Sequence, residues 1–134
     1  MSRDIDWIAL RAAAEQAASH AHAPYSHFRV GAALQTESGQ VVTGCNVENA
    51  SYGLTICAER NALFSAVAQG HRVFVAIAIV TGGQAPWAPC GACRQVLVEF
   101  PPDFAVRSYC AGAEVLEQST ATLLPHAFDR KNLG

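Results

Sequence analysis

The sequence predicts an α/β protein in which one mixed five-stranded sheet is covered by helices. Segments with apolar residues at helical spacing alternate with short segments rich in β-branched residues, in the order α-β-β-α-β-α-β-β-α. No internal repeat or low-complexity segment interrupts this order. The length of 134 residues suits a single domain over residues 1–134, which would bury about two thirds of the surface that the unfolded chain exposes.

The first elements are a helix and a hairpin. Ser2 or Asp4 can cap a first helix, whose apolar residues recur at helical spacing: Ile5, Ile8, Ala9, Ala12 and Ala13. Residues 29–36 and 41–46 then flank a four-residue turn that contains glycine, as in a β-hairpin.

A second helix and a buried strand follow. The helix is predicted over residues 55–69, with Gly70 in the position of a C-terminal stop. Its apolar face is formed by Ala62, Leu63, Ala66 and Val67. Residues 73–81 are a continuous apolar run of strand length, which predicts a strand buried on both faces at the centre of the sheet.

The last third of the chain supplies the remaining elements. Residues 90–100 are predicted to form a helix that Pro101 ends. Two short strands are expected at 105–110 and 114–118, and a final short helix or turn at 122–128.

Composition excludes several classes of protein. The net charge is −2, and the chain has a single lysine. A surface that binds nucleic acid commonly makes about 6–10 phosphate contacts through basic side chains, so no nucleic-acid partner is expected. The longest apolar run, residues 73–80, is far shorter than the roughly 20 residues of a membrane helix. Acidic residues and helical periodicity in residues 1–20 argue against a signal peptide there. Five cysteines, an odd number, favour metal or thiol chemistry in a reducing cytoplasm. With 51% hydrophobic and only 15% charged residues, hidden surface at a subunit interface is expected.

Three cysteines are candidate metal ligands. Cys90 and Cys93 lie three apart at the start of a predicted helix, where the helix dipole favours thiolates. Alone, this pair could be a redox couple, half of a structural zinc site or two buried thiols. Cys57 begins the other predicted helix in the same way, and three soft ligands with a fourth position open suit catalytic Zn²⁺, one ion per chain.

Polar residues beside these cysteines complete the chemistry. Glu59 can reach the metal's solvent position only if Cys57 lies at the very start of its helix, and from there it could shuttle protons. Three thiolates leave Zn²⁺ with a net charge of −1, which Arg60 or Arg94 could offset by hydrogen bonding to sulfur. Gln95 follows Arg94 and is grouped with these supporting residues.

The segments Thr55-Ile-Cys-Ala-Glu-Arg60 and Pro89-Cys-Gly-Ala-Cys-Arg-Gln95 resemble the zinc-dependent cytidine deaminase family in its three-cysteine form. Blocks 24–34, 46–52 and 123–128 also look like those of the small homotetrameric enzymes that act on free nucleosides. The resemblance implies a three-layer fold and hydrolysis of cytidine and 2′-deoxycytidine to uridine, 2′-deoxyuridine and ammonia, as in pyrimidine salvage.

The resemblance also implies roles for individual residues. Cys57, Cys90 and Cys93 would bind zinc, and Glu59 would transfer protons during attack at C4 and departure of the amine. The substrate contacts that it implies are stacking by Phe28 on the pyrimidine, ribose binding by Asn46 and Glu48, and backbone contacts of Ala58 and Cys90 with the base. Tyr52 and Phe128 would complete the pocket of a neighbouring subunit in a homotetramer.

Other interpretations remain open at this point. A related deaminase for blasticidin S shares the Cys-Ala-Glu-Arg block, although the Leu-Leu-Pro block before Phe128 argues against it. A structural zinc or redox module would need a fourth protein ligand or a Cys90–Cys93 disulfide. Three residues without a motif are assigned to packing, namely Cys45, Trp87 and Cys110. None of the histidines is assigned to zinc; they are His20, His22, His27, His71 and His126.

Overall fold

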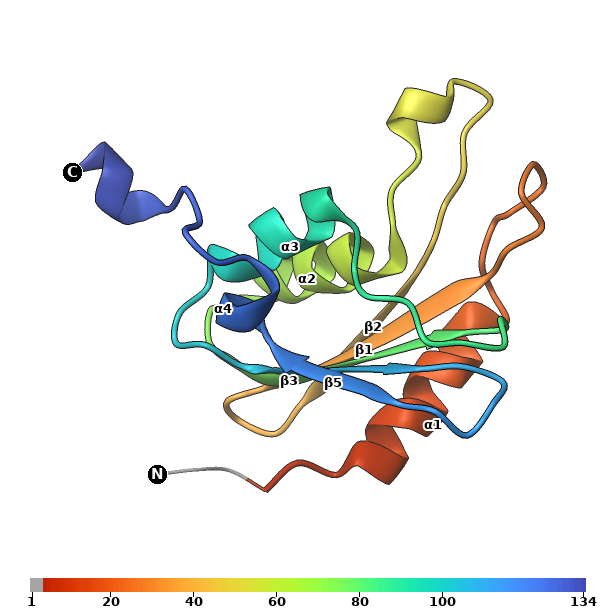
Figure 1. The fold of residues 1–134 in the computed structure, drawn as a ribbon, viewed down its shortest axis with the longest axis horizontal. Coiled ribbons are helices and arrows are strands. Elements are labelled where there is room, and N and C mark those ends of the chain that lie inside the picture. The colour runs from red at the N-terminus through yellow and green to blue at the C-terminus, as the bar shows by residue number, and fades with distance from the viewer. Residues whose placement is uncertain (1–3) are drawn as a thin grey trace.

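In the computed structural model, which describes residues 4–134, one mixed sheet is covered by helices on both faces (Figure 1). Its five strands run in the order β2-β1-β3-β4-β5. They are β1 (Val30–Thr36), β2 (Val41–Cys45), β3 (Phe74–Thr81), β4 (Ala105–Tyr109) and β5 (Leu116–Ser119). The predicted strand number and element order are both confirmed.

Strand β3 is the centre of the sheet. It pairs antiparallel with β1, so that Thr81 lies opposite Val30, and parallel with β4, so that Ala76 lies opposite Ala105. A parallel pair needs a crossover connection. Helix α3 (Gly91–Val98) lies in the connection that joins the end of β3 to the start of β4. The strand is buried along most of its length, as its continuous apolar run predicts.

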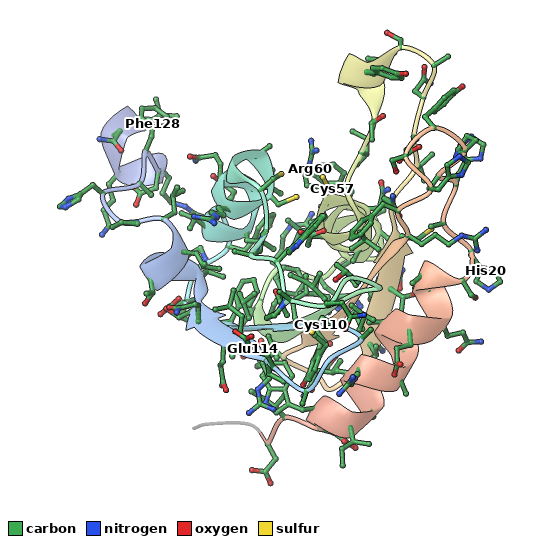
Figure 2. All side chains as sticks on the ribbon, turned by 45° about the vertical axis from the view of Figure 1, so that its right-hand side comes forward. His20, Cys57, Arg60, Cys110, Glu114 and Phe128 are labelled. Atoms are coloured by element: carbon green, nitrogen blue, oxygen red, sulfur yellow. The ribbon has the colours of Figure 1, made fainter. Side chains whose placement is uncertain are left out.

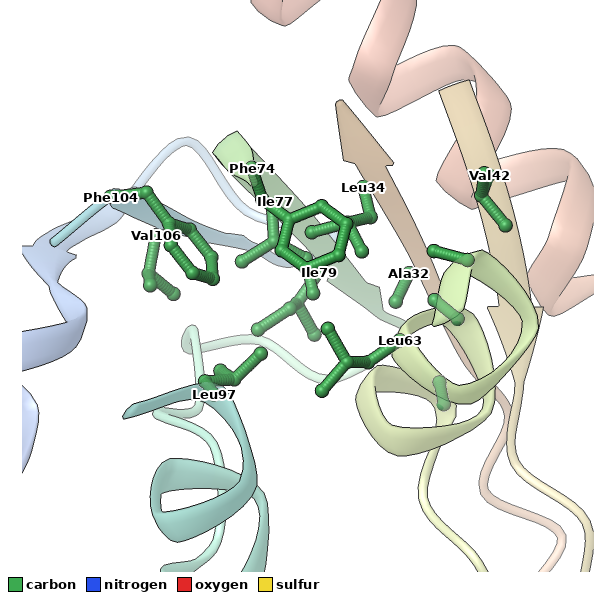
Figure 3. Close-up of a cluster of buried hydrophobic side chains, with 13 residues drawn as sticks. Ala32, Leu34, Val42, Leu63, Phe74, Ile77, Ile79, Leu97, Phe104 and Val106 are labelled. Carbon is green, nitrogen blue, oxygen red and sulfur yellow. The ribbon is translucent and has the colours of Figure 1, made fainter. Parts of the chain in front are cut away.

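The helices form the two outer layers. Helix α1 (Trp7–Ala18) packs on one face, where Leu10 and Ala14 join a buried cluster with residues of β1, β3 and β4. Helices α2 (Ala58–Ala68) and α3 cover the other face, where Leu63 and Leu97 meet the sheet residues Leu34, Phe74, Ile77, Ile79 and Val106 (Figure 3). The arrangement is therefore helix, sheet, helix in three layers.

Two glycines in the hairpin allow both helices to approach the sheet closely. A Cβ at Gly31 would overlap the backbone carbonyl of Ala14 in α1, and a Cβ at Gly44 would overlap the backbone of Ala62 in α2. Neither obstacle is a flexible side chain that could move aside. The hairpin thus sets how deeply α2 sits, and α2 begins at the cavity described below.

The first helix differs from its prediction in its cap and in its buried face. Asp6 is the cap, since its side chain accepts a hydrogen bond from the Ala9 amide at 3.0 Å; Asp4 is not the cap, and Ser2 lies outside the described residues. The buried residues are Leu10, Ala14 and Ala17, whereas Ile8 is 86% exposed. Alanine occurs on every side of this helix, so the apolar spacing did not identify the face that packs.

Two later helices also differ from their predicted bounds. Helix α2 begins at Ala58 instead of residue 55, because Ile56 pairs with Val47 and Cys57 is still extended. The C-terminal helix α4 is Thr120–Leu123, earlier than predicted, and short 3-10 helices occur at Tyr52–Leu54 and Arg130–Leu133. None of the helices within residues 4–134 has the length and apolar character to cross a bilayer.

Candidate active site

A cavity of about 480 Å³ lies where the N-termini of α2 and α3 meet the end of β3. The segments that enter β1 and leave β2, together with the loop before α3, form its other walls. Its lining residues are Ser26, Phe28, Val30, Asn46, Glu48, Thr55, Cys57, Ala58, Glu59, Ile79, Thr81, Trp87, Ala88 and Cys90. The size suits a small organic ligand.

Three thiols converge beside this cavity. Cys57 is the N-cap of α2, Cys90 is the N-cap of α3, and Cys93 lies in the first turn of α3. Their sulfur atoms lie within 4.8 Å of one another, and those of Cys57 and Cys90 are 3.8 Å apart. Among residues 4–134, the group able to hold a metal contains these three side chains alone. Three soft donors with a cavity on the fourth side fit Zn²⁺ in a catalytic site and not a closed structural one.

The thiols differ in their affinity for protons. Hydrogen bonding, first to Cys93 and then to Arg60, lowers the pKa of Cys57 to about 5 against the opposing effect of burial. The hydrogen bond with Cys57, together with burial, raises the pKa of Cys93. The site therefore holds at least one thiolate near neutral pH, which is the protonation state that metal binding requires.

Glu59 faces the same cavity from the first turn of α2. Its side chain is buried, and the residue is only 5% exposed. Burial raises the pKa of Glu59 to about 6, and the charge on Cys57 acts in the same direction. Because Cys57 is the N-cap and still extended, it and Glu59 both reach the cavity although they are two residues apart. A carboxyl group with this pKa can both accept and donate a proton near neutral pH.

The structure distinguishes the two candidate arginines. Arg60 Nη2 donates a hydrogen bond to Cys57 Sγ at 3.5 Å, and the two side chains lie next to each other in Figure 2. This bond raises the pKa of Arg60 and keeps it charged. Arg94 instead donates to the carbonyl oxygens of Pro89, at 2.7 Å, and Leu123, at 3.2 Å. The expectation that Arg94 could bond to a thiolate is wrong, because its guanidinium is directed at backbone oxygens.

Gln95 has a similar backbone role. Its Nε2 donates to the carbonyl oxygen of Phe128 at 2.7 Å. With Arg94 bound to Leu123, α3 thus holds the C-terminal segment at two points. Gln95 supports the position of Phe128 and is not hydrogen-bonded to a thiol.

The two polar residues that the resemblance assigns to ribose hold the loop that carries Phe28. Asn46 Nδ2 donates to the Phe28 carbonyl at 2.8 Å, and Asn46 Oδ1 accepts from the Val30 amide at 2.9 Å. Glu48 Oε1 accepts from the amides of Tyr25 and Ser26, and Glu48 Oε2 accepts a short hydrogen bond from the Ser26 hydroxyl. These hydrogen bonds fix the backbone from which the Phe28 ring projects. Both side chains also line the cavity.

Tyr52 and Phe128 are not among the residues that line the cavity. Tyr52 is 74% exposed and lines a neighbouring hollow of about 410 Å³ that shares Ser26, Glu48 and Thr55 with the cavity. Phe128 is 60% exposed on the C-terminal segment, well apart from Cys57 in Figure 2. Both aromatic rings are thus available on the surface of a single chain.

Several cavity-lining residues were not assigned to the site from the sequence, and three of them have polar or aromatic side chains that bear on it: Trp87, Ser26 and Thr81. Trp87, assigned to packing, is 54% exposed and lines the cavity, where it stacks on Phe28. Its position three residues before Cys90 was the available signal. Ser26 holds Glu48, and Thr81 brings to the wall a buried hydroxyl that has no hydrogen-bond partner among the described residues. Neither residue lies in a sequence pattern that marks it as part of a site.

Comparisons with known proteins agree with this geometry. Residues 6–108 match the family model described as the cytidine and deoxycytidylate deaminase zinc-binding region. The chain belongs to this family, and the three-layer fold and zinc as the cofactor are confirmed.

Individual relatives cover nearly the whole chain. A cytidine deaminase of Mycobacterium tuberculosis is 52% identical over 136 aligned residues, which span 97% of this chain and 95% of the relative. A cytidine deaminase of Halalkalibacterium halodurans is 49% identical over 120 residues, covering 89% and 91% of the two chains. The crystal structure of a cytidine deaminase from Burkholderia pseudomallei superposes with a TM-score of 0.89, at 53% identity, over 92% of this chain and all of the other.

Proposed function

We propose that this protein hydrolytically deaminates cytidine and 2′-deoxycytidine, giving uridine, 2′-deoxyuridine and ammonia, as in pyrimidine salvage. The observation that carries the proposal is the buried Glu59 carboxyl group beside three convergent thiols in a cavity of nucleoside size. Relatives named as cytidine deaminases share about half of the sequence over nearly its full length.

The charges of the cavity favour a free nucleoside over a nucleotide. The charged residues among its lining side chains are Glu48 and Glu59, and neither lysine nor arginine lines it. A 5′-phosphate would bring negative charge towards carboxylates without a cation to pair with. A polynucleotide substrate is disfavoured for the same reason, in agreement with the net charge of −2.

Cys57, Cys90 and Cys93 would hold the zinc ion. When bound, zinc would supply the Lewis acidity that makes water nucleophilic at neutral pH. Arg60 offsets the negative charge of the three thiolates through its hydrogen bond to Cys57. The N-termini of α2 and α3 add positive potential at the same point.

Glu59 carries the protons of the reaction. Its carboxylate accepts a proton from the attacking water, donates one to N3 of the pyrimidine, and then assists departure of the C4 amine as ammonia. A pKa of about 6 suits this alternation, because the ionised form that accepts the first proton predominates at neutral pH while the protonated form stays accessible. Burial keeps bulk water from competing for the proton.

Phe28, Asn46 and Glu48 bind the nucleoside in this proposal. The Phe28 ring supplies an apolar face for the pyrimidine. An amide nitrogen has two protons and a carboxylate about four acceptor sites, so Asn46 and Glu48 can contact ribose hydroxyls while they hold the loop. The backbone of Ala58 and Cys90 lies in the cavity wall, where it can meet the base.

We also propose that four chains assemble and complete one another's pockets. The exposed rings of Tyr52 and Phe128 and the high apolar content of the chain support this assembly. Light scattering should give about four times the 14.2 kDa of one chain. A fully active monomer would contradict the proposal. The whole chain is proposed to be one domain that works in the cytoplasm, where thiol ligands stay reduced.

The deciding experiment combines a metal assay with ammonia release from cytidine, deoxycytidine, cytidine 5′-monophosphate and blasticidin S. One zinc per chain and turnover of the first two compounds are expected. Glu59→Gln should retain zinc and fold but lose at least about 10²–10⁴ in turnover, since it keeps the shape and loses the proton carrier. Zinc without turnover of any cytosine nucleoside would instead support a binding module, and near-normal turnover by Glu59→Gln would refute its assigned role.

A further inference from the structure

Trp87 stacks face to face on Phe28 inside the cavity. The ring centroids are 4.4 Å apart and the ring planes differ by 13°. No ligand atom fits between rings at this distance, so one face of Phe28 is covered by Trp87. A pyrimidine that stacks on Phe28 must therefore use the opposite face.

The two rings come from separately anchored backbones. On one side, Phe28 is held through its carbonyl by Asn46 and through its amide by the Ser26 hydroxyl, which accepts a hydrogen bond at 3.0 Å. On the other side, Trp87 lies in the loop between β3 and Cys90, outside any helix or strand. The stack thus joins the hairpin side of the cavity to the metal-ligand side.

Hydrogen bonds fix the Trp87 loop at both ends. The Gly83 carbonyl accepts from the Ala111 amide at 2.8 Å, and the Pro89 carbonyl accepts from Arg94 Nε at 2.7 Å. The tip of the Phe28 ring also reaches this loop, since a Cβ at Gly83 would lie 3.9 Å from Phe28 Cζ. Phe28 therefore lies along this loop, next to both Trp87 and Gly83.

Exposure indicates that the stack serves a ligand and not the core. Trp87 is 54% exposed and lies outside both buried clusters, so its ring contributes little to holding the fold together. An offset or parallel aromatic contact prefers one relative orientation of the rings. That preference would hold the plane of Phe28 before substrate arrives.

We propose that Trp87 is a positioning residue that fixes the ring plane of Phe28 for stacking on the nucleobase and forms part of the cavity wall. The inference rests on the proposed nucleoside deamination. Trp87 acts through Phe28 and takes no part in proton transfer, which is assigned to Glu59. Loss of the indole should weaken nucleoside binding and leave the chemical step nearly intact.

The kinetic test compares Trp87→Ala, Trp87→Phe and wild type on cytidine. Trp87→Ala should raise KM about 3- to 10-fold, the range that an aromatic pair confers, with little change in kcat. Trp87→Phe keeps a stacking ring and should restore KM. Zinc content and thermal unfolding should match wild type. An unchanged KM, or a fall in kcat that follows loss of zinc or stability, would overturn the inference.

A double-mutant cycle separates positioning from simple wall contact. If Trp87 acts through Phe28, Phe28→Ala should remove most of the effect of Trp87→Ala, so that the two changes are not additive. Additive effects on KM would refute action through Phe28. An inactive wild-type protein would overturn the proposed function itself, a result distinct from an active wild type with indifferent Trp87 variants.

Fluorescence supplies a readout that a structural role would not change. The chain has two tryptophans, and Trp7 packs under Arg107 at 4.4 Å, away from the cavity. In a Trp7→Phe background, uridine is a suitable probe because it is not consumed. Saturable change of the Trp87 emission is expected, and Phe28→Ala should alter the emission before uridine is added. Trp87 emission that changes neither on addition of uridine nor on replacement of Phe28 by Ala would contradict the inference.

Discussion

Asn46 and Phe28 are joined by a hydrogen bond of 2.8 Å from the Asn46 side-chain amide to the Phe28 carbonyl, and the same side chain accepts from the amide of Val30. One buried amide therefore bridges the backbone on both sides of Arg29, where the loop enters β1. Asn46 therefore anchors the backbone that carries the Phe28 ring, whether or not it also contacts ribose.

Replacing Asn46 by Ala should affect both stability and binding. The change leaves two backbone groups without their partner, so we expect a loss of about 1–3 kcal/mol in the free energy of unfolding. KM for cytidine should rise more than kcat falls, because the Phe28 ring is no longer fixed. Denaturant unfolding and steady-state kinetics measure the two effects. Asn49→Ala, which loses only a local turn contact with Ser51, is the control. Equal stability of the two variants would contradict this account.

The Ser26–Glu48 pair should give a pH-dependent contribution. The hydrogen bond from Ser26 lowers the pKa of Glu48 in the folded protein. A lowered pKa stabilises the fold above the unfolded-state value, and this stabilisation disappears as the pH falls through the folded-state value. Ser26→Ala should therefore unfold at a lower temperature than wild type at pH 7, and the difference should shrink below about pH 4.

The matched control for this pair is Ser51→Ala, because Ser51 precedes a 3-10 helix without capping it through its side chain. Its difference from wild type should be small and independent of pH. NMR titration of Glu48 gives a direct measurement, with a higher pKa expected in Ser26→Ala. An unshifted pKa would show that the backbone amides alone hold the carboxylate.

Arg60 should tune the metal site while Arg72 should not. Arg60→Gln removes the charged hydrogen bond to Cys57. Mutation of a residue that hydrogen-bonds to a metal ligand typically lowers metal affinity or activity by about 10–100-fold, so weaker zinc binding is expected. Competition with a chelator measures zinc affinity directly. Arg72→Gln is the control, since Arg72 donates only to the carbonyls of Val67 and His71 at the exposed end of α2. Equal zinc affinities of the Arg60→Gln and Arg72→Gln variants would mean that the helix dipoles alone offset the charge of the thiolates.

Gly44→Ala should destabilise the protein and disturb the site together. The added Cβ would overlap the backbone of Ala62 and push α2 from the sheet, at a cost of about 1–3 kcal/mol. Because Cys57 and Glu59 lie at the start of α2, turnover should fall as well. Gly82→Ala, where a Cβ meets nothing within 4 Å, is expected to be nearly neutral. Thermal unfolding and ammonia release measure both effects, and a neutral Gly44→Ala would show that α2 is not seated by this glycine.

Each half of the metal site could be predicted from the sequence, because each cysteine motif is local. Cys57 and Cys90 each end an extended segment at a helix start, and Cys93 follows within one turn, so sequence spacing alone places their thiols near helix N-termini. The central strand was equally predictable, since burial on both faces requires a continuous apolar run. The buried face of α1 was not predictable, because alanines lie on every side of this helix. Only contact with the sheet selects Leu10, Ala14 and Ala17 as its buried residues.

By itself, the sequence determined the element order, the cysteine and glutamate residues available at two helix starts, and the resemblance to a deaminase family. The tertiary structure alone decided which arginine donates to a thiol. It also decided that Asn46 and Glu48 bond to the segment around Phe28 and that Trp87 stacks on the Phe28 ring. Arg60 and Arg94 have the same chemistry and similar positions beside a cysteine, but different backbones surround them, so one donates to sulfur and the other to carbonyl oxygens. The stack of Trp87 on Phe28 joins residues far apart in the chain, and no periodicity or spacing encodes a contact that two separately anchored loops create.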